Sequence, residues 1–152
     1  MAKKKVNSKI LLVIDLDVLE RYSKYYFSIH TRAKKKPIPR PYHESINVWM
    51  ILRRSAMNSL KQKWKEFIKW LVEDQGYANL HIDKCEIHQI VYYPNNRPHD
   101  VDNSVPKFIL DGLVEGGMIT NDSSNHLTKL ILQCETDVGN PRTELHITIL
   151  DN

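Results

Sequence analysis

The chain has 152 residues, of which 41% are hydrophobic and 26% charged, a size and composition that suit one domain with one hydrophobic core. Its longest apolar run, Ile10 to Ile14, is too short to span a bilayer, so the sequence predicts no membrane protein. The basic N-terminus leads into an apolar stretch that Asp15 and Asp17 interrupt, which is not typical of a secretory signal. We therefore expect a cytoplasmic protein.

The formal net charge of +4 hides an uneven distribution along the chain. Residues 1–75 carry 17 Lys and Arg against 7 Asp and Glu, whereas residues 76–152 carry 5 against 11. Lys and Arg attract phosphate backbones, and clustered carboxylates need a cation. A polyanion partner for the basic half and a metal site in the acidic half would explain the asymmetry. A solvated, charged helix face is the alternative that charge alone leaves open.

The first half predicts two strands, a loop and a long helix. Ile10 to Leu19 is apolar and β-branched enough for a strand, and Tyr25 to Ile29 is a weaker candidate for a second one. Thr31 to Pro41 combines three prolines with several cationic residues, which predicts an exposed basic loop. From Glu44 to Asp74 apolar residues recur at steps of three and four, which indicates an amphipathic helix.

The second half predicts three strands and one helix, in an order that gives an α+β fold. The expected segments are a strand at Leu80 to Tyr93, a turn at Pro94 to Pro98, a helix from Asn103 or Ser104 to Gly116-Gly117, a loop at Thr120 to Asn125, and strands at Leu127 to Glu135 and Thr143 to Leu150. A hairpin-like connection at 137–141 should join the last two strands. We expect a single domain over 1–152, with a mixed sheet packed against the long helix and the shorter one.

Three aspartates within the region 94–126 surround the shorter helix and are candidate metal ligands. Asp100 and Asp102 lie at a junction between strand and helix, where an extended i, i+2 spacing would aim both carboxylates to one side. Asp122 follows the helix, which would fold back and bring it near the first pair. Carboxylate oxygens of this kind suit Mg²⁺ or Mn²⁺. The alternative is that all three aspartates are turn and cap residues.

The stretch HDVDNSVPKFILDGLVEGGMITNDSSNH, residues 99–126, resembles the signature of RusA-type Holliday-junction resolvases, the crossover junction endodeoxyribonucleases. That family shows D-x-D-N, a lysine a few residues later, an apolar helix ending near D-G-L, and a glycine turn that leads to a further aspartate. The resemblance implies that Asp100, Asp102 and Asp122 bind Mg²⁺ and are catalytic. It places the family's lysine at Lys107, which would stabilise charge on the phosphate.

The resemblance also implies a mixed α+β homodimer that cleaves four-way DNA junctions by paired phosphodiester hydrolysis in recombination and repair. The amphipathic helix, with Ile68 and Trp70, is a candidate dimer interface. His99 could ligate the metal or position a water, although an exposed residue is the simpler expectation. The basic residues expected to contact DNA are Lys34, Lys35, Lys36, Arg40, Arg53, Arg54, Lys61 and Lys65.

Two other functions compete with the nuclease. The chain could be a DNA-binding protein without catalytic activity, in which the carboxylates are structural. It could also be a phosphatase of the haloacid dehalogenase type, because Asp15 and Asp17 follow the apolar strand as a D-x-D pair. Cys85 and Cys134 lie far apart without a C-x-x-C pair, so we expect free thiols rather than a zinc or redox site.

Overall fold

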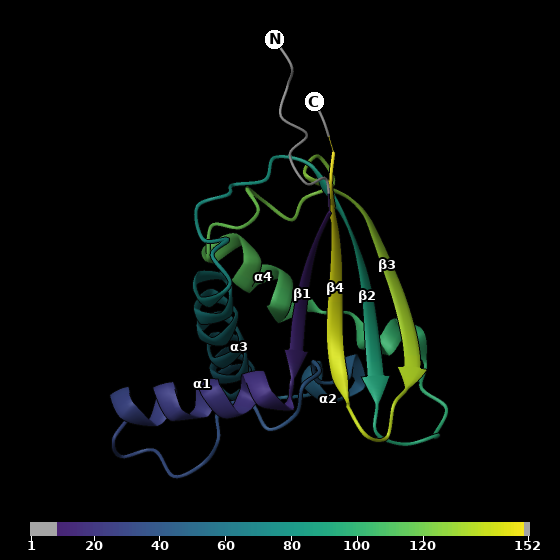
Figure 1. The fold of residues 1–152 in the computed structure, drawn as a ribbon. Helices are drawn as coiled ribbons and strands as arrows, with labels where there is room; N and C mark the ends of the chain where they lie inside the picture. The colour runs from purple at the N-terminus through teal and green to yellow at the C-terminus, as the bar shows by residue number, and fades with distance from the viewer. Residues whose placement is uncertain (1–8, 151–152) are drawn as a thin grey trace.

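The structure, a computed structural model, describes residues 9–150 and is an α+β domain, as the sequence predicts. One mixed sheet has the strand order β1-β4-β2-β3, with the helices gathered on one side of it (Figure 1). The strands are β1 (Lys9–Asp15), β2 (Cys85–Tyr93), β3 (Leu127–Thr136) and β4 (Arg142–Ile149). The helices are α1 (Leu16–Ile29), α2 (Ile46–Trp49), α3 (Arg54–Asp74) and α4 (Lys107–Glu115), with a 3₁₀ turn η1 (Val101–Ser104). None of the helices within 9–150 is long and apolar enough to cross a membrane.

Strand β4 pairs antiparallel with both β1 and β2, whereas β2 and β3 are parallel. Because side chains alternate along a strand, Ile87 of β2 and Leu145 of β4 point into the core, where they meet Phe67 and Leu71 of α3. Within residues 9–150, the other face of the sheet carries no helix (Figure 1). Leu11 and Ile131 on that face are 48% and 43% exposed.

The segment after β1 is a helix, so the prediction of a strand at Tyr25 to Ile29 is wrong, and the first strand ends at Asp15 rather than Leu19. The Asp15 carboxylate accepts a hydrogen bond of 2.9 Å from the backbone N–H of Val18 and so caps α1. Val18, Leu19 and Tyr22 are buried at helical spacing, and this packing overrides their β propensity.

The predicted long helix is divided in two by residues 50–53, where Ile51 is 83% exposed. In α3, Ile68 is fully buried and the Trp70 ring lies 5.2 Å from that of Tyr22. These two residues therefore use apolar surface within the chain, while Trp70 is only partly buried, and an interface on this helix stays a prediction.

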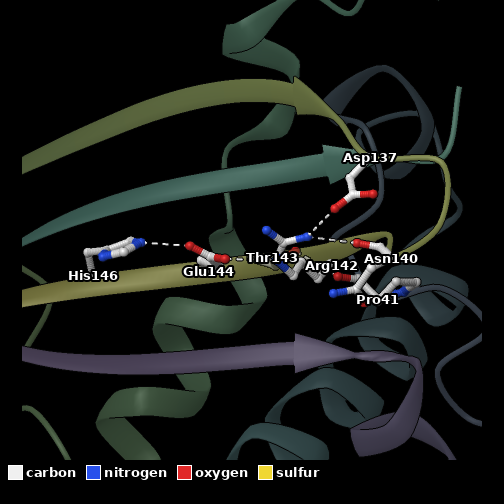
Figure 2. A network of polar contacts seen from close by, with 7 residues as sticks. All are labelled: Pro41, Asp137, Asn140, Arg142, Thr143, Glu144 and His146. Atoms are coloured by element: carbon white, nitrogen blue, oxygen red, sulfur yellow. Dashed lines mark hydrogen bonds and ion pairs between the residues drawn. The ribbon is translucent and has the colours of Figure 1, made fainter. Parts of the chain in front are cut away.

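Strands β3 and β4 do not form the expected hairpin, because β2 lies between them. Their connection crosses the end of β2, where the backbone N–H of Asp137 donates to Tyr93 O. Arg142 fixes this crossing by donating to the Asp137 carboxylate at 2.8 Å and to Asn140 O at 2.9 Å (Figure 2). Its guanidinium also lies 3.7 Å from the centre of the Tyr92 ring.

Helices α3 and α4 approach closely at Gly112. A Cβ added there would lie 2.5 Å from the Ile68 Cβ, in a fully buried contact. We expect Gly112→Ala to lower the free energy of unfolding by about 1–3 kcal/mol, even though alanine favours helix by about 1 kcal/mol. Chemical denaturation would measure this. Gly139→Ala is the control, because its nearest contact is the Asp137 side chain at 4.0 Å, and an equal loss in both variants would contradict the steric explanation.

Candidate metal centre and nucleic-acid surface

Asp100 and Asp102 follow β2 in the chain, at the start of η1 and within it, on the helix-covered side of the sheet near the carboxyl end of β2, and both are exposed. Hydrogen bonds hold this short turn on the sheet. The buried Gln89 side chain of β2 donates to Ser104 O at 2.9 Å, and Ser104 Oγ donates to Val101 O at 2.6 Å. The two carboxylates are therefore fixed in position by the backbone while remaining open to solvent.

Asp122 lies at the opposite end of the sheet. After α4 the chain turns at Gly117 and reaches the residues that precede β2, where Ile82 N–H donates to Met118 O and Thr120 N–H donates to Ile82 O. Asp122 follows directly, near the amino end of β2. A strand of nine residues separates this end from Asp100, a distance of roughly 25 Å.

The expectation that α4 brings Asp122 near the first pair is therefore wrong within a single chain. A helix that connects two adjacent parallel strands must return to the end at which the first strand began. In agreement with this separation, residues 9–150 contain no group of three His, Cys, Asp or Glu side chains that could hold a metal ion. Asp100 and Asp102 alone offer the hard oxygen ligands that Mg²⁺ prefers, and Mg²⁺ is often bound by one or two carboxylates.

Lys107 is the first residue of α4 and lies at the same end of the sheet as the D-x-D pair. Its Nζ is 3.7 Å from Asp111 Oδ1, and Lys61 Nζ of α3 is 3.9 Å from Asp111 Oδ2. That second oxygen is buried and has no hydrogen-bond partner among residues 9–150. Asp111, to which we assigned no role from the sequence, thus orients two of the predicted cationic residues.

His43 fixes the start of α4, although no sequence pattern singles it out. Its ring is buried, and its Nε2 accepts from the backbone N–H of Phe108 at 3.1 Å. Nδ1 must therefore carry the proton, which it donates to Glu44 O at 2.8 Å. Burial lowers the pKa of His43 to about 4, so the ring is neutral. Trp64 stacks on it, with centroids 5.5 Å apart.

The segment expected to be an exposed basic loop is anchored at several points. Ile38 is 2% exposed, and Thr143 Oγ1 donates to Pro41 O at 2.7 Å (Figure 2). The cationic side chains nevertheless point outward, since Lys34, Lys35, Lys36 and Arg40 are exposed. Apolar residues and prolines thus hold the backbone while the charges remain accessible.

The remaining predicted DNA contacts lie on α3 or just before it. Arg53 and Arg54 are exposed where α3 begins. Lys61 and Lys65 pair with acidic residues of α4, and the contact from Lys65 Nζ to Glu115 Oε2 is 2.7 Å. Ion pairing reduces what these two lysines can offer a phosphate, and Lys36 of the loop is likewise 3.6 Å from Glu20 Oε2. The two arginines and the other cationic residues of the loop are therefore the stronger candidates.

Asp15, the residue on which the phosphatase alternative rests, caps α1 through its carboxylate. It ends an edge strand that pairs antiparallel with β4. The structure therefore gives Asp15 a role in folding.

Comparison with known proteins identifies no related protein or family. No protein-family model matches the chain, and a search of curated proteins finds no match. The resemblance to the resolvases thus rests on residues 99–126 alone, and the function has to be argued from the geometry.

His43 makes stability depend on pH in a defined direction. Its pKa is about 4 in the folded protein, against 6.5 for a solvated histidine ring. Between these pH values the His43 ring is protonated in the unfolded chain but not in the folded one. The free energy of unfolding therefore falls as pH is lowered from 6.5 to 4, by at most about 3 kcal/mol. We expect His43→Gln to flatten this region of the curve of unfolding free energy against pH.

The half-buried His30, which pairs with Glu66 at the surface, provides a control, because His30→Gln should leave most of the slope in place. Burial raises the pKa of the Glu44 carboxyl, so Glu44 changes the pH dependence of stability in the opposite direction. Because Glu44 is present in both proteins, its contribution cancels in the comparison. Identical slopes for wild type and His43→Gln would show that His43 is not held neutral.

Proposed function

We propose that the protein is a Mg²⁺-dependent, structure-specific endodeoxyribonuclease that resolves four-way DNA junctions as a homodimer. The observation that carries the proposal is the exposed Asp100 and Asp102 pair near the carboxyl end of β2, in a β2-α4-β3 unit. Open sheets commonly bind ligands in this region, beyond the carboxyl ends of parallel strands. The resemblance of residues 99–126 to the resolvases supplies the reaction and the substrate.

The metal site would be completed by a second chain. Asp122 lies at the amino end of β2, roughly 25 Å from the pair at its carboxyl end. A two-fold axis perpendicular to the strands would bring the amino end of one copy beside the carboxyl end of the other. Each of two identical sites would then hold Asp100 and Asp102 from one chain and Asp122 from its partner.

The helix-free face of the sheet is a candidate interface for the homodimer. Its middle row across the strands is Leu11, His146, His88 and Ile131, and these residues line a shallow hollow of about 540 Å³. The row has an apolar side chain at each end and two histidines in the middle, and a second sheet could cover it.

The two ends of this face carry opposite charge, so two copies related by the two-fold axis would place opposite charges against each other. The row at the amino end of β2 contains Lys9 and Lys129 around Glu86, an excess of positive charge. The row at the carboxyl end contains Asp15 and Glu135 around Arg142, an excess of negative charge. Antiparallel stacking of two copies would place opposite rows against each other.

In the proposed reaction, the aspartates bind the metal and the cationic residues bind the DNA. Mg²⁺ would supply Lewis acidity to the scissile phosphodiester and activate a water molecule. Lys107, oriented by Asp111, would face the phosphate as charge develops on it. Arg53, Arg54 and the basic loop would contact the neighbouring phosphates. Two such sites related by a two-fold axis match the symmetry of a four-way junction, which needs two nicks.

A DNA-binding protein without catalytic activity remains the second candidate. The observation that favours it is the separation of Asp122 from Asp100 and Asp102 within one chain. Incubating junction DNA with and without Mg²⁺ distinguishes the two candidates, since only the nuclease releases nicked arms when the metal is present.

Mixing inactive variants tests whether the site is shared between chains. Asp102→Asn and Asp122→Asn should each abolish junction cleavage, because each removes a ligand from both sites of a homodimer. In a mixed dimer, however, the intact Asp100 and Asp102 of one chain meet the intact Asp122 of the other. We expect an equal mixture to regain about a quarter of the wild-type sites, seen as single nicks rather than paired ones, if dimers form at random.

A matched control uses two variants of the same half-site. Asp100→Asn mixed with Asp102→Asn should regain nothing, because every site then lacks one of the paired carboxylates. If the Asp102→Asn and Asp122→Asn mixture also stays inactive although exchange of chains is demonstrated, the shared site is wrong.

The basic loop should contribute affinity without sequence preference. Changing Lys34, Lys35 and Lys36 together to Gln should weaken binding to junction and duplex alike, because phosphate contacts carry no base information. The slope of log affinity against log salt should decrease by up to about 3. Fluorescence anisotropy over a salt series would measure it. Lys24→Gln with Lys63→Gln, two exposed lysines to which we assign no DNA contact, is the control, and an unchanged slope in the triple variant would show that the loop is merely solvated.

A further inference from the structure

A separate hollow of about 240 Å³ lies next to the D-x-D pair, at the carboxyl end of β2. It is smaller than the roughly 300–1,000 Å³ of pockets that bind drug-sized molecules, so it suits a single planar ring system. A second hollow, which Asp100 lines, shares Ser45, Tyr93 and His99 with it. A ligand in the first hollow would therefore lie directly beside the proposed metal site.

The walls of this pocket are flat. The rings of Tyr93 and His99 are stacked, with centroids 3.6 Å apart and an interplanar angle of 9°. The Tyr42 ring lies 4.9 Å from that of Tyr93 and also lines the pocket. Because these rings are already held against one another, they lose little further conformational entropy when a planar group packs on them.

The pocket also contains polar groups that can form further hydrogen bonds. His99 Nε2 is buried and has no hydrogen-bond partner among residues 9–150, which is costly unless a ligand supplies one. The Glu44 carboxylate accepts from Trp64 Nε1 through Oε2 alone, at 2.7 Å. Arg40 is exposed on the lining of the pocket, where it can meet a phosphate.

We propose that the pocket of Tyr42, Glu44, Tyr93 and His99 holds one unstacked nucleobase of the bound DNA strand, beside the phosphate at Asp100. Flat aromatic walls, unsatisfied polar groups and an arginine on the lining together match a nucleotide and not a purely apolar ligand. The inference rests on the proposed function only because that function brings a DNA strand to Asp100.

Glu44 would give the pocket a preference among bases. A carboxylate accepts hydrogen bonds from an exocyclic amine, as on cytosine, and thymine carries no such group. The base that enters should therefore be one with an amine, and this contact would select where along the strand the phosphate is presented to Asp100.

The test is a scan of single abasic sites along one strand of a four-way junction, with affinity measured in EDTA so that no cleavage occurs. For the wild-type protein we expect one position at which removing the base weakens binding by roughly 5- to 100-fold. In Tyr42→Ala protein the same abasic site should cost little. Glu44→Gln, whose amide oxygen can still accept from Trp64 while its NH2 group faces the base, should lose the preference for an amine-bearing base at that position but retain most of the affinity.

Tyr25→Ala is the control, because Tyr25 is an exposed aromatic residue on α1, outside the pocket lining. A flat scan for the wild type, or the same costly position in Tyr42→Ala, would overturn the inference. Failure of the proposed function is distinguishable, since it appears as absence of Mg²⁺-dependent cleavage while the abasic scan retains its costly position. Cleavage with a flat scan would leave the function standing and remove the pocket.

Discussion

The parallel pairing of β2 with β3 is the constraint on which the rest of the site depends. Two adjacent parallel strands require a crossover that returns to the starting end, and α4 makes this return along the covered face of the sheet. The aspartates before and after α4 are therefore held at opposite ends of β2. One chain cannot bring Asp122 to Asp100 and Asp102 without breaking this pairing, so a three-carboxylate site requires two chains.

Hydrogen bonds near the carboxyl end of β2 hold the segments around Asp100 and Asp102. Gln89 holds η1, His43 holds the first turn of α4, and Arg142 holds the connection between β3 and β4. Burial opposes ionisation of Glu144, but hydrogen bonds from Arg142 and His146 outweigh it and lower the pKa of this carboxyl. Asp100 and Asp102 are exposed, the Asn103 amide donates to Asp100 Oδ2 at 3.5 Å, and the buried His99 Nε2 in the pocket beside them has no hydrogen-bond partner among residues 9–150.

Much of this fold follows from patterns that are local in the sequence. Strand β2, the body and end of α4 and the last two strands lie where alternation and glycine turns predict them, because burial on one face fixes those patterns. The predicted cap of α4 at Asn103 or Ser104 is wrong, because both residues belong to η1 and the helix begins at Lys107 without a side-chain cap. Helix α1 was predicted as strand, because its aromatic and β-branched residues favour strand until their burial against α3 is known. Strand order is a long-range property, and for that reason the expected hairpin between β3 and β4 was wrong. The position of Asp122 depends on the same order, and His43 acts only through contacts with residues far along the chain, such as Phe108.

The most direct test of the shared site is whether the metal and the dimer depend on each other. If Mg²⁺ binds between chains, it must strengthen their association, since a ligand that prefers one state shifts the equilibrium toward it. Sedimentation equilibrium of the wild type, with and without Mg²⁺, should show a tighter dimer with the metal, and Asp122→Asn should lose this effect while still dimerising in EDTA. Equal dimer dissociation constants with and without Mg²⁺, together with metal binding to the dilute monomer, would contradict the account.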